Sequence, residues 1–443
     1  MTPAAAASGA AGETVALAEG VHVTTLPSGL RVATERMPHV RSATVGWWVD
    51  VGSRDEDPAL AGATHFLEHL LFKGTAHRSA RDIAEAFDAI GGDSNAFTTK
   101  EHTCFLARVL DRHVEDAIAV LGDMIRNARC APDDVEAERQ VVLEELRLHE
   151  DTPDELCHSL WCAAHFDGHP LGREVLGSFE TVEAVSNEAI ADWYHRQYVP
   201  GNVVVSAAGN LEHDRIVEAV ARALEGVEPQ PVAGHPHPRR APDRVGDRRV
   251  VVQPKPIEQA HVVLGGPGLP RHDERRWAAA VVDVALGGSM ASRLFQEVRE
   301  RRGLAYAVAS EQQQHRDVGI FDVYAATSPG RLDELLSALR GELDALRRDG
   351  LTPDELARAK ASLAGGVVMG LEDTGSRMAR LGRALLGGQP YRTLDEILGL
   401  IDAVDEDAIA AAADAVLGGP DPLAVVGPVE EDAADELARW CAA

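Results

Sequence analysis

The stretch THFLEHLLFKGT, residues 64–75, places His65, Glu68 and His69 within five positions. It has helical character and ends near Gly74, a residue type that commonly terminates a helix. On a helix, His65 and His69 lie one turn apart on the same face, so their ring nitrogens can hold one metal ion. Glu68 can then take a proton from a water on that ion. The alternative is an amphipathic helix whose surface carries two unrelated histidines.

A second segment offers the third protein ligand that a catalytic zinc site needs beside two histidines and an open position. It reads DDVEAERQVVLEELRLHED, residues 133–151, and places Glu138, Glu144 and Glu145 around an apolar stripe. Glu138 and Glu145 are seven residues apart and therefore share one helix face. The residue pattern alone does not choose between Glu144 and Glu145, and a charged helix surface is the ordinary alternative.

The composition excludes several classes of protein. The chain has 443 residues, enough for two or three domains, and its formal net charge of -28 excludes nucleic-acid binding through a general basic field. Its five cysteines are scattered and odd in number, which indicates a reduced compartment. No lysine or arginine precedes Arg31, and no apolar stretch reaches membrane-spanning length. We expect a soluble cytoplasmic protein, not associated with a membrane, whose residues 1–20 form a disordered tail.

The order of elements predicts an α+β fold in two similar halves. The first half, residues 21–227, begins with strands, continues with helices that include both segments described above, and returns to a buried strand. A stretch rich in proline and charge, residues 228–247, is predicted to be a linker. The second half, residues 248–443, again runs through strands, helices, strands and helices. Each half is near the ordinary size of a domain.

The histidine motif, combined with ERQVVLEE at residues 138–145, resembles the pitrilysin/insulinase family of zinc metallopeptidases. Within that family it is similar to the mitochondrial processing peptidase type, an inverzincin, in which the zinc motif is inverted to H-x-x-E-H. The resemblance implies that His65, His69 and Glu145 hold one zinc ion per chain. It implies equally that Glu68 is the catalytic general base.

Two further features of the first half are similar to the family. Glu138 matches an acidic residue that lies behind the metal ligands and orients the site. GGDSNAFTTKEHTCF, residues 91–105, resembles the family's substrate-binding strand, and from the residues alone it is predicted to be part of a hairpin. The resemblance implies that Asn95, Ala96 and Phe97 line an extended peptide substrate.

The second half carries one more motif of this kind. SRLFQEVRERRGLAY, residues 292–306, resembles the family segment whose arginine and tyrosine contact substrate near the scissile bond. Those residues are Arg299 and Tyr306 here. A guanidinium and a phenol can both donate to a carbonyl oxygen as it becomes an oxyanion. The alternative is a solvated helix arginine and a tyrosine in the core of a strand.

The resemblance also implies a function and an assembly. The expected protein is a zinc-dependent endopeptidase that cleaves peptides or unfolded segments inside a chamber. Each chain would supply two homologous domains, each an antiparallel-rich sheet packed by helices, which form half of a clamshell. Because the family chamber needs four domains and this chain carries both motifs, a homodimer is expected. A heterodimer with a degenerate sister subunit is the other possibility, and a non-catalytic structural subunit of the same fold is the alternative function.

Overall fold

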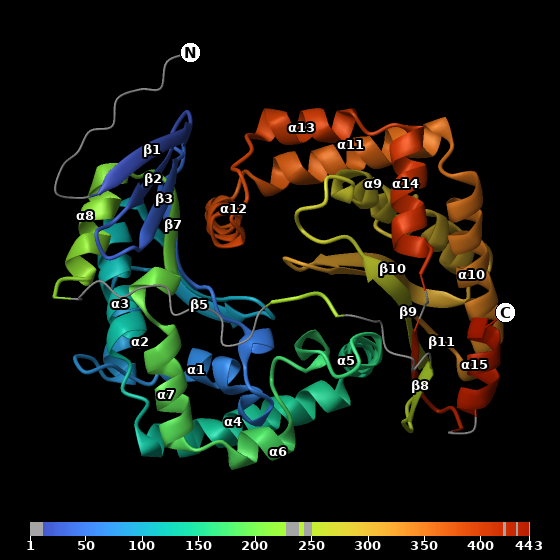
Figure 1. The fold of residues 1–443 in the computed structure, drawn as a ribbon, viewed down its shortest axis with the longest axis horizontal. Helices are drawn as coiled ribbons and strands as arrows, with labels where there is room; N and C mark the ends of the chain where they lie inside the picture. The colour runs from blue at the N-terminus through green and yellow to red at the C-terminus, as the bar shows by residue number, and fades with distance from the viewer. Residues whose placement is uncertain (1–11, 227–238, 243–249, 420–421, 431–432, 443) are drawn as a thin grey trace. The chain divides into compact units, whose positions relative to one another are not determined.

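The computed structural model describes the chain except for residues 1–11, 227–238, 243–249, 420–421, 431–432 and 443 (Figure 1). The chain forms two compact units. The first unit comprises residues 1–146, 174–238 and 369–393, and the second comprises residues 147–173, 239–368 and 394–443. Each unit contains one sheet and several helices, so the predicted α+β class is confirmed. Within the described residues, no helix combines the length and the apolar character needed to cross a membrane.

The first unit is built on a seven-stranded sheet in which only β3 and β7 are parallel neighbours. Along the sheet the strands are β1 (Glu13–Ala18), β2 (Val21–Thr25), β3 (Arg31–Arg36), β7 (Val203–Gly209), β4 (Ser42–Val49), β6 (Thr103–Leu110) and β5 (Asp93–Thr98). β4 is buried at every position after its first residue. A strand loses its polar alternation in this way when both faces of its sheet are covered.

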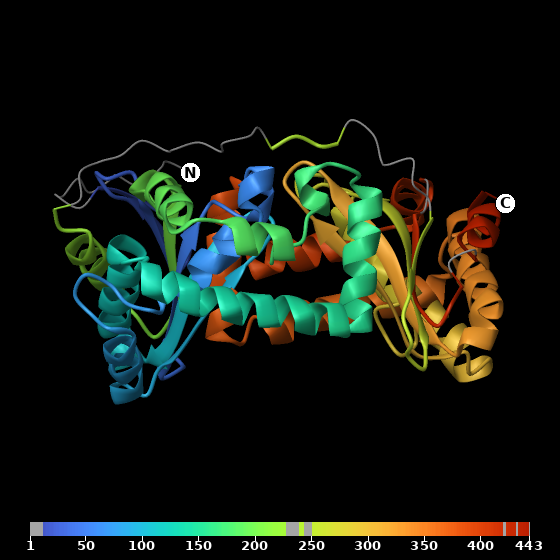
Figure 2. The same ribbon diagram turned by 90° about the horizontal axis from the view of Figure 1, so that it is seen from below.

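One face of this sheet packs against a layer of helices, and the other packs against α12 (Thr374–Gly387). The helices of the layer are α1 (Ala63–Leu71), α2 (Ala80–Ala89), α3 (Val114–Asn127), α4 (Pro132–Asp151), α6 (Phe179–Ala184), α7 (Asn187–Gln197) and α8 (His213–Ala223). α4 is the longest of them, with 20 residues, and is the long horizontal teal helix of Figure 2.

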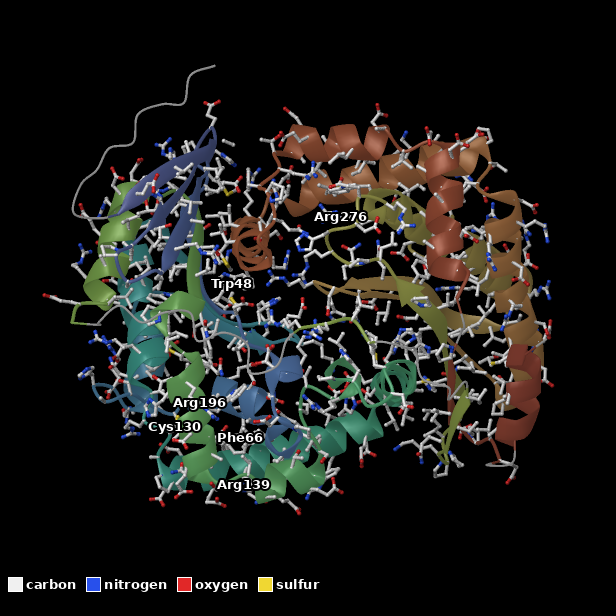
Figure 3. The ribbon with its side chains drawn as sticks, in the orientation of Figure 1. Trp48, Phe66, Cys130, Arg139, Arg196 and Arg276 are labelled. Carbon is white, nitrogen blue, oxygen red and sulfur yellow. The ribbon has the colours of Figure 1, made fainter. Side chains whose placement is uncertain are left out.

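Two glycines allow α12 to approach the sheet closely. A Cβ atom on Gly46 of β4 would lie 2.5 Å from the Sδ atom of Met378, and a Cβ atom on Gly382 would lie 2.2 Å from the ring of Trp48. Real side chains do not reach such distances, so larger residues at either position would push α12 away. The indole of Trp48 (Figure 3) lies beneath the helix and donates from Nε1 to the Ser206 hydroxyl at 2.8 Å.

The second unit is built on a five-stranded sheet. Its strands, in spatial order, are β10 (Ala305–Gln314), β11 (Gly319–Thr327), β9 (Ala260–Gly268), β12 (Leu423–Gly427) and β8 (Val250–Pro254), and only β12 and β8 are parallel. One face packs against α9 (Arg276–Leu286), α10 (Leu332–Asp349) and α14 (Glu406–Leu417). The other face is covered by α5 (Pro153–His165), whose Cys157 and Trp161 pack on the strands. The remaining helices of the unit are α11 (Pro353–Gly370), α13 (Leu394–Asp402) and α15 (Ala433–Ala442).

The compact units differ from the two predicted halves because two helices each pack on the sheet of the other half. α5 lies in the predicted first half but packs in the second unit, and α12 lies in the predicted second half but packs in the first unit. The physical reason is that an apolar helix face shows that a helix is packed but not which sheet it covers. Most of the predicted linker, residues 228–247, lies outside the described residues.

Two smaller predictions were wrong. Residues 1–20 were expected to be disordered, yet Glu13–Ala18 form β1, an edge strand that pairs antiparallel with β2. The alanine-rich composition gives no strand pattern, because the pairing of β1 with β2 uses backbone groups and does not require buried side chains. α1 was expected to end at Gly74 but ends at Leu71, because its last turn tightens and the Lys73 N–H donates to the Leu70 carbonyl at 3.0 Å. The predicted hairpin is confirmed as β5 and β6, which are paired antiparallel.

Candidate metal centre

The helix that carries the histidine motif is anchored at its first turn. The buried carboxylate of Glu56 accepts hydrogen bonds from the Gly62 N–H at 2.8 Å and from the Thr64 N–H at 2.6 Å. A carboxylate is favourable there because the first amides of a helix have no partner within it and carry partial positive charge. The apolar face of α1, including Phe66 and Leu70, is buried in the core. His65, Glu68 and His69 lie on the half-buried opposite face.

The second helix of the site, α4, is held against α1 by Arg139. The Arg139 guanidinium carbon lies 5.7 Å from the centroid of the Phe66 ring, a cation–π contact between the two helices (Figure 3). The same guanidinium donates to the carbonyl oxygens of Val182 and Val185. On this helix Glu145 is half-buried and turned toward the histidines, whereas Glu144 is exposed. The choice that the residue pattern left open is therefore resolved geometrically in favour of Glu145.

Three potential ligand atoms converge between α1 and α4. The Glu145 Oε2 atom lies 3.6 Å from His65 Nε2 and 3.4 Å from His69 Nε2. Ligand atoms about 2.0–2.2 Å from a tetrahedral zinc ion are about 3.3–3.6 Å apart, so the spacing fits. Within the described residues, this is the one group of three such side chains whose ligand atoms all lie within 4.8 Å. The Glu145 Oε2 atom is buried and makes no hydrogen bond, which a cation at this point would compensate.

A chain of polar contacts lies behind His69. The His69 Nδ1 atom is 3.2 Å from Glu138 Oε2, and Glu138 Oε1 is 2.5 Å from Lys73 Nζ. Glu138 is only 4% exposed. A proton on His69 Nδ1 that points to this carboxylate leaves Nε2 free to bind a metal, which is how carboxylates orient metal-bound histidines. The predicted position of Glu138 behind a ligand agrees with this geometry.

Burial shifts the pKa values of two side chains in the site, His65 and Glu68. Burial, and secondarily the neighbouring His69, lowers the pKa of His65 to about 4, so this imidazole is neutral, as a metal ligand must be. Burial raises the pKa of Glu68, and a hydrogen bond from the Thr98 hydroxyl opposes the shift. A raised pKa is what a carboxylate would need to act as a general base near neutral pH.

The predicted substrate strand lies at one edge of the first sheet. β5 is the last strand in the order, and among the described residues it pairs only with β6. Asn95, Ala96 and Phe97 lie in its middle, and the next residue, Thr98, donates a hydrogen bond of 2.6 Å to Glu68 Oε2. The open side of an edge strand can accept an extended chain through main-chain hydrogen bonds. The structure thus brings the predicted substrate strand directly beside the histidine motif.

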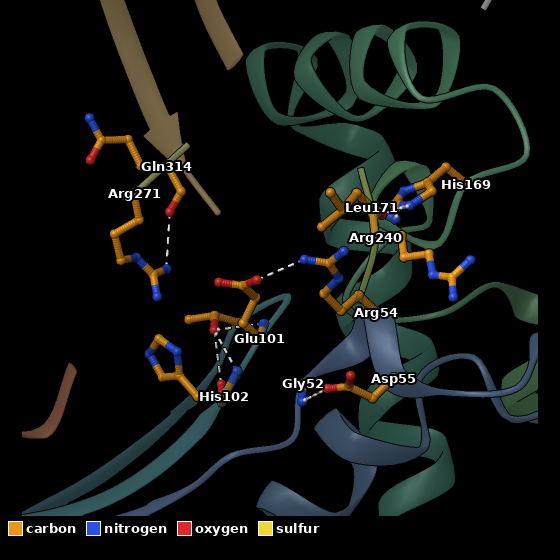
Figure 4. Close-up of polar contacts among 11 residues, drawn as sticks. Gly52, Arg54, Asp55, Glu101, His102, His169, Leu171, Arg240, Arg271 and Gln314 are labelled. Atoms are coloured by element: carbon orange, nitrogen blue, oxygen red, sulfur yellow. Dashed lines mark hydrogen bonds and ion pairs between the residues drawn. The ribbon is translucent and has the colours of Figure 1, made fainter. Parts of the chain in front are cut away.

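The loop that precedes α1 also fixes the β5–β6 turn. Arg54 Nη1 lies 2.7 Å from Glu101 Oε1, and both side chains are at most 5% exposed (Figure 4). The Ser53 N–H donates to the Thr99 carbonyl at 3.1 Å, and the Arg54 N–H donates to the Lys100 carbonyl at 3.0 Å. The same loop carries Glu56, the anchor of α1. One short segment therefore sets the positions of both the motif helix and the substrate strand.

The other predicted pair lies in the second unit. Arg299 belongs to a π-helical segment, η6 (Phe295–Arg301), and Tyr306 is the second residue of β10. The Arg299 guanidinium carbon lies 4.3 Å from the centroid of the Tyr306 ring, and Arg299 Nη1 donates to the Tyr306 carbonyl at 3.1 Å. Tyr306 is 78% exposed, so the alternative of a core tyrosine was wrong. Arg299 is half-buried, so the pair consists of an exposed phenol with a partly covered guanidinium held against it.

Three contributors to the metal centre were not found from the sequence. Lys73 is four residues after His69, which is a helical spacing and was an available signal. Thr98 directly follows Phe97 in the substrate strand, so the strand itself pointed to it. Glu56 had no local signal, because its contact with the first turn of α1 depends on the path of the intervening loop.

Two histidines of an H-x-x-E-H helix meet a glutamate of a second helix in this fold. This combination is typical of the metallopeptidases with an inverted zinc motif. A family model described as Insulinase (Peptidase family M16) matches residues 31–178, and one described as Peptidase M16 inactive domain matches residues 184–363. The chain belongs to this M16 peptidase family. The first match contains every residue of the candidate metal centre, and the second contains the Arg299 and Tyr306 pair.

Similar proteins cover nearly the whole chain. An uncharacterized zinc protease of Streptomyces coelicolor is 48% identical over 94% of this chain and 92% of its own length. One of Mycobacterium leprae is 45% identical over 95% of each chain, and YmxG of Bacillus subtilis is 38% identical over 91% of this chain and 97% of its own. Among solved structures, a protease from Helicobacter pylori has a TM-score of 0.86 at 20% identity and covers 92% of this chain and 99% of its own. At 20% identity, the similarity to this solved structure shows the fold alone.

Proposed function

We propose that the protein is a zinc-dependent endopeptidase that cleaves peptides or unfolded segments, with one zinc ion per chain held by His65, His69 and Glu145. The observation that carries the proposal is the convergence of these three side chains around a buried Glu145 oxygen without a hydrogen bond. The names of the similar proteins, zinc proteases, support the same metal. Bound zinc would supply Lewis-acid chemistry, which polarises a carbonyl and acidifies a water.

Side chains of this chain supply the base, the substrate-binding strand and the orientation of a metal ligand. Glu68 takes the proton of the attacking water and later gives it to the leaving amine. Asn95, Ala96 and Phe97 bind the substrate as an added strand along β5, so that the peptide lies extended beside the base. Glu138 holds His69 in the orientation that keeps Nε2 free. These roles need a substrate segment that is not already folded.

Arg299 and Tyr306 are proposed to stabilise the oxyanion that forms at the scissile carbonyl. Tyr306 is exposed and the half-buried Arg299 side chain is held against it, which suits two donors that act on one oxygen. We propose further that they serve the metal centre of a second chain in a homodimer, because the family chamber is built from four domains. A heterodimer with a degenerate sister subunit would satisfy the same requirement.

The proposed function is tested with three glutamate variants. Glu68→Gln should retain zinc and lose at least about a hundredfold in peptide cleavage, because only the base is removed. Glu145→Gln should lose zinc, while Glu144→Gln, its exposed neighbour on the same helix, should retain both zinc and activity. Zinc is measured by elemental analysis after dialysis, and cleavage is measured on a peptide library by mass spectrometry. Wild-type protein that takes up no divalent metal would overturn the metal centre.

The homodimer is tested by complementation. A Glu68→Gln chain and an Arg299→Ala chain should each be nearly inactive, and the mixture should recover activity after the chains exchange, because some sites then pair an intact base with an intact arginine. The active species should elute as a dimer, about twice 47.4 kDa. Exchanged dimers without recovered activity would contradict the shared site. Recovery that requires an added sister subunit would indicate the heterodimer.

A non-catalytic structural subunit is the second candidate. It is favoured by the description of the family model for residues 184–363 as an inactive domain. It predicts no cleavage that depends on Glu68, so the same glutamate variants separate the two functions. We also propose a cytoplasmic location, which is supported by the buried free thiols of Cys104, Cys130 and Cys157.

A further inference from the structure

Thr98 forms a direct contact between the substrate strand and the proposed base. It is the last residue of β5, and its hydroxyl donates to the Glu68 Oε2 atom at 2.6 Å. Hydrogen bonds of this length to a carboxylate are shorter and stronger than those between neutral groups. The contact joins residues that are 30 positions apart in the chain. It is therefore a product of the fold and not of local helix geometry.

Because side chains alternate between the two faces of β5, the Thr98 side chain lies on the face that is covered by α1. Ala96 and Thr98 are two residues apart and lie on the same face of the strand. Ala96 packs against the core between the sheet and the helical layer, which includes α1. Phe97 points to the opposite face, where its ring centroid lies 5.7 Å from that of Trp48. The Thr98 hydroxyl consequently faces the helix that carries Glu68.

Both ends of this contact are held by buried groups. Glu56 anchors the first turn of α1, and the Arg54–Glu101 ion pair fixes the turn that follows Thr98. The Thr99 N–H also donates to the His102 carbonyl at 2.8 Å, which closes that turn. Threonine itself has few χ1 rotamers, so its hydroxyl has little freedom. The position of the Glu68 carboxylate is thus determined before a substrate arrives.

We propose that Thr98 is a positioning residue for catalysis. Its hydroxyl occupies one oxygen of the Glu68 carboxylate and leaves the other oxygen to accept the proton of the attacking water. Because Thr98 belongs to the strand on which the peptide is proposed to bind, it also sets the base in register with the bound main chain. This inference rests on the proposed endopeptidase function.

The test compares Thr98→Val, which keeps the shape and removes the hydroxyl, with Thr98→Ser, which keeps the hydroxyl. Thr98→Val should lower kcat by about tenfold or more, since one hydrogen bond to a charged group is lost. Its KM and its zinc content should stay at the wild-type values. Thr98→Ser should restore kcat to within about threefold of wild type. Thr98→Ala repeats the comparison if the valine variant does not fold.

Two further measurements separate positioning from packing and from binding. In a Glu68→Gln background, Thr98→Val should cause no further loss of cleavage, because residues that act through one another are not additive. In the same inactive background, the dissociation constant of a fluorescent peptide should be equal with threonine or valine at position 98.

Specific outcomes would overturn the inference. Equal kcat for Thr98→Val and wild type, or equal losses for Thr98→Val and Thr98→Ser, would exclude a role of the hydroxyl. A higher KM with an unchanged kcat would make Thr98 a binding residue instead. Wild-type protein that neither binds zinc nor cleaves peptides would remove the proposed function and this inference together, whereas an active wild type with an equally active valine variant would remove only the inference.

Discussion

Replacing Glu138 by glutamine removes one negative charge behind the metal centre while it keeps the shape of the side chain. Glu138 is 4% exposed and makes two charged contacts, at 3.2 Å to His69 Nδ1 and at 2.5 Å to Lys73 Nζ. The glutamine amide can still accept from His69 through its oxygen, but its NH₂ group then faces the Lys73 ammonium, which is also a donor. Under the proposed function, His69 should therefore become a weaker zinc ligand and lose part of its orientation.

The expected size of the effect follows from this geometry. Loss of a carboxylate behind a metal-bound histidine typically costs a factor of about 10–100 in metal affinity. This corresponds to about 1.4–2.8 kcal/mol of binding free energy. Because Lys73 is 38% exposed, its ammonium can turn toward water, so the cost should not reach that of a fully buried unpaired charge.

The assay is competition for zinc between the protein and a chromophoric chelator at constant pH and ionic strength. Glu144→Gln is the matched control, because Glu144 lies on the same helix and its side chain is exposed. The control should bind zinc as the wild type does. Equal zinc affinities for Glu138→Gln and wild type would refute the idea that this carboxylate supports the metal centre.

Three further results are expected. Arg54→Met should lower the free energy of unfolding by about 3–5 kcal/mol, because it leaves the buried Glu101 carboxylate without its ion pair, and adding Glu101→Gln should recover much of the loss in urea denaturation. Burial lowers the pKa of His165 to about 4, so the folded protein binds fewer protons than the unfolded chain. The contribution of the neutral His165 ring to the free energy of unfolding is complete above about pH 6.5 and is lost as the pH falls toward 4, by about 2–3 kcal/mol at pH 4.5. His165→Phe should flatten this pH dependence in denaturant titrations at constant zinc. Chelation of zinc should lower the calorimetric melting temperature, because zinc at about 1,000 times its Kd contributes about 4 kcal/mol, and a melting temperature that does not respond would contradict the metal centre.

Helical and strand periodicity predicted the parts of the site that depend on local geometry. The spacing of four placed His65 and His69 on one face, and the hairpin with its turn at Lys100 and Glu101 was evident from its strand pattern. The choice of Glu145 over Glu144 came from the family resemblance, and the physical difference, a half-buried Glu145 beside the histidines and an exposed Glu144, becomes visible only in the packed structure.

The remaining features depend on contacts between distant segments. Glu56 and Thr98 act on α1 from a loop and a strand, and no local spacing encodes those contacts. The exchange of α5 and α12 between the predicted halves has the same origin, since any sheet of suitable shape can accept an apolar helix face. A strand at a sheet edge, such as β1, is equally hard to predict, because its pairing uses backbone groups that every sequence has.

The edge position of β5 has a consequence for substrate choice under the proposed function. Its open side presents N–H and C=O groups that match the main chain of any extended segment. A segment within a folded protein already uses those groups in its own helices or sheets. Selection at β5 would therefore discriminate by the folding state of a chain before it discriminates by amino-acid sequence. Susceptibility to cleavage should follow the local opening free energy of a substrate, so that termini and loops are cut first and stable cores are spared.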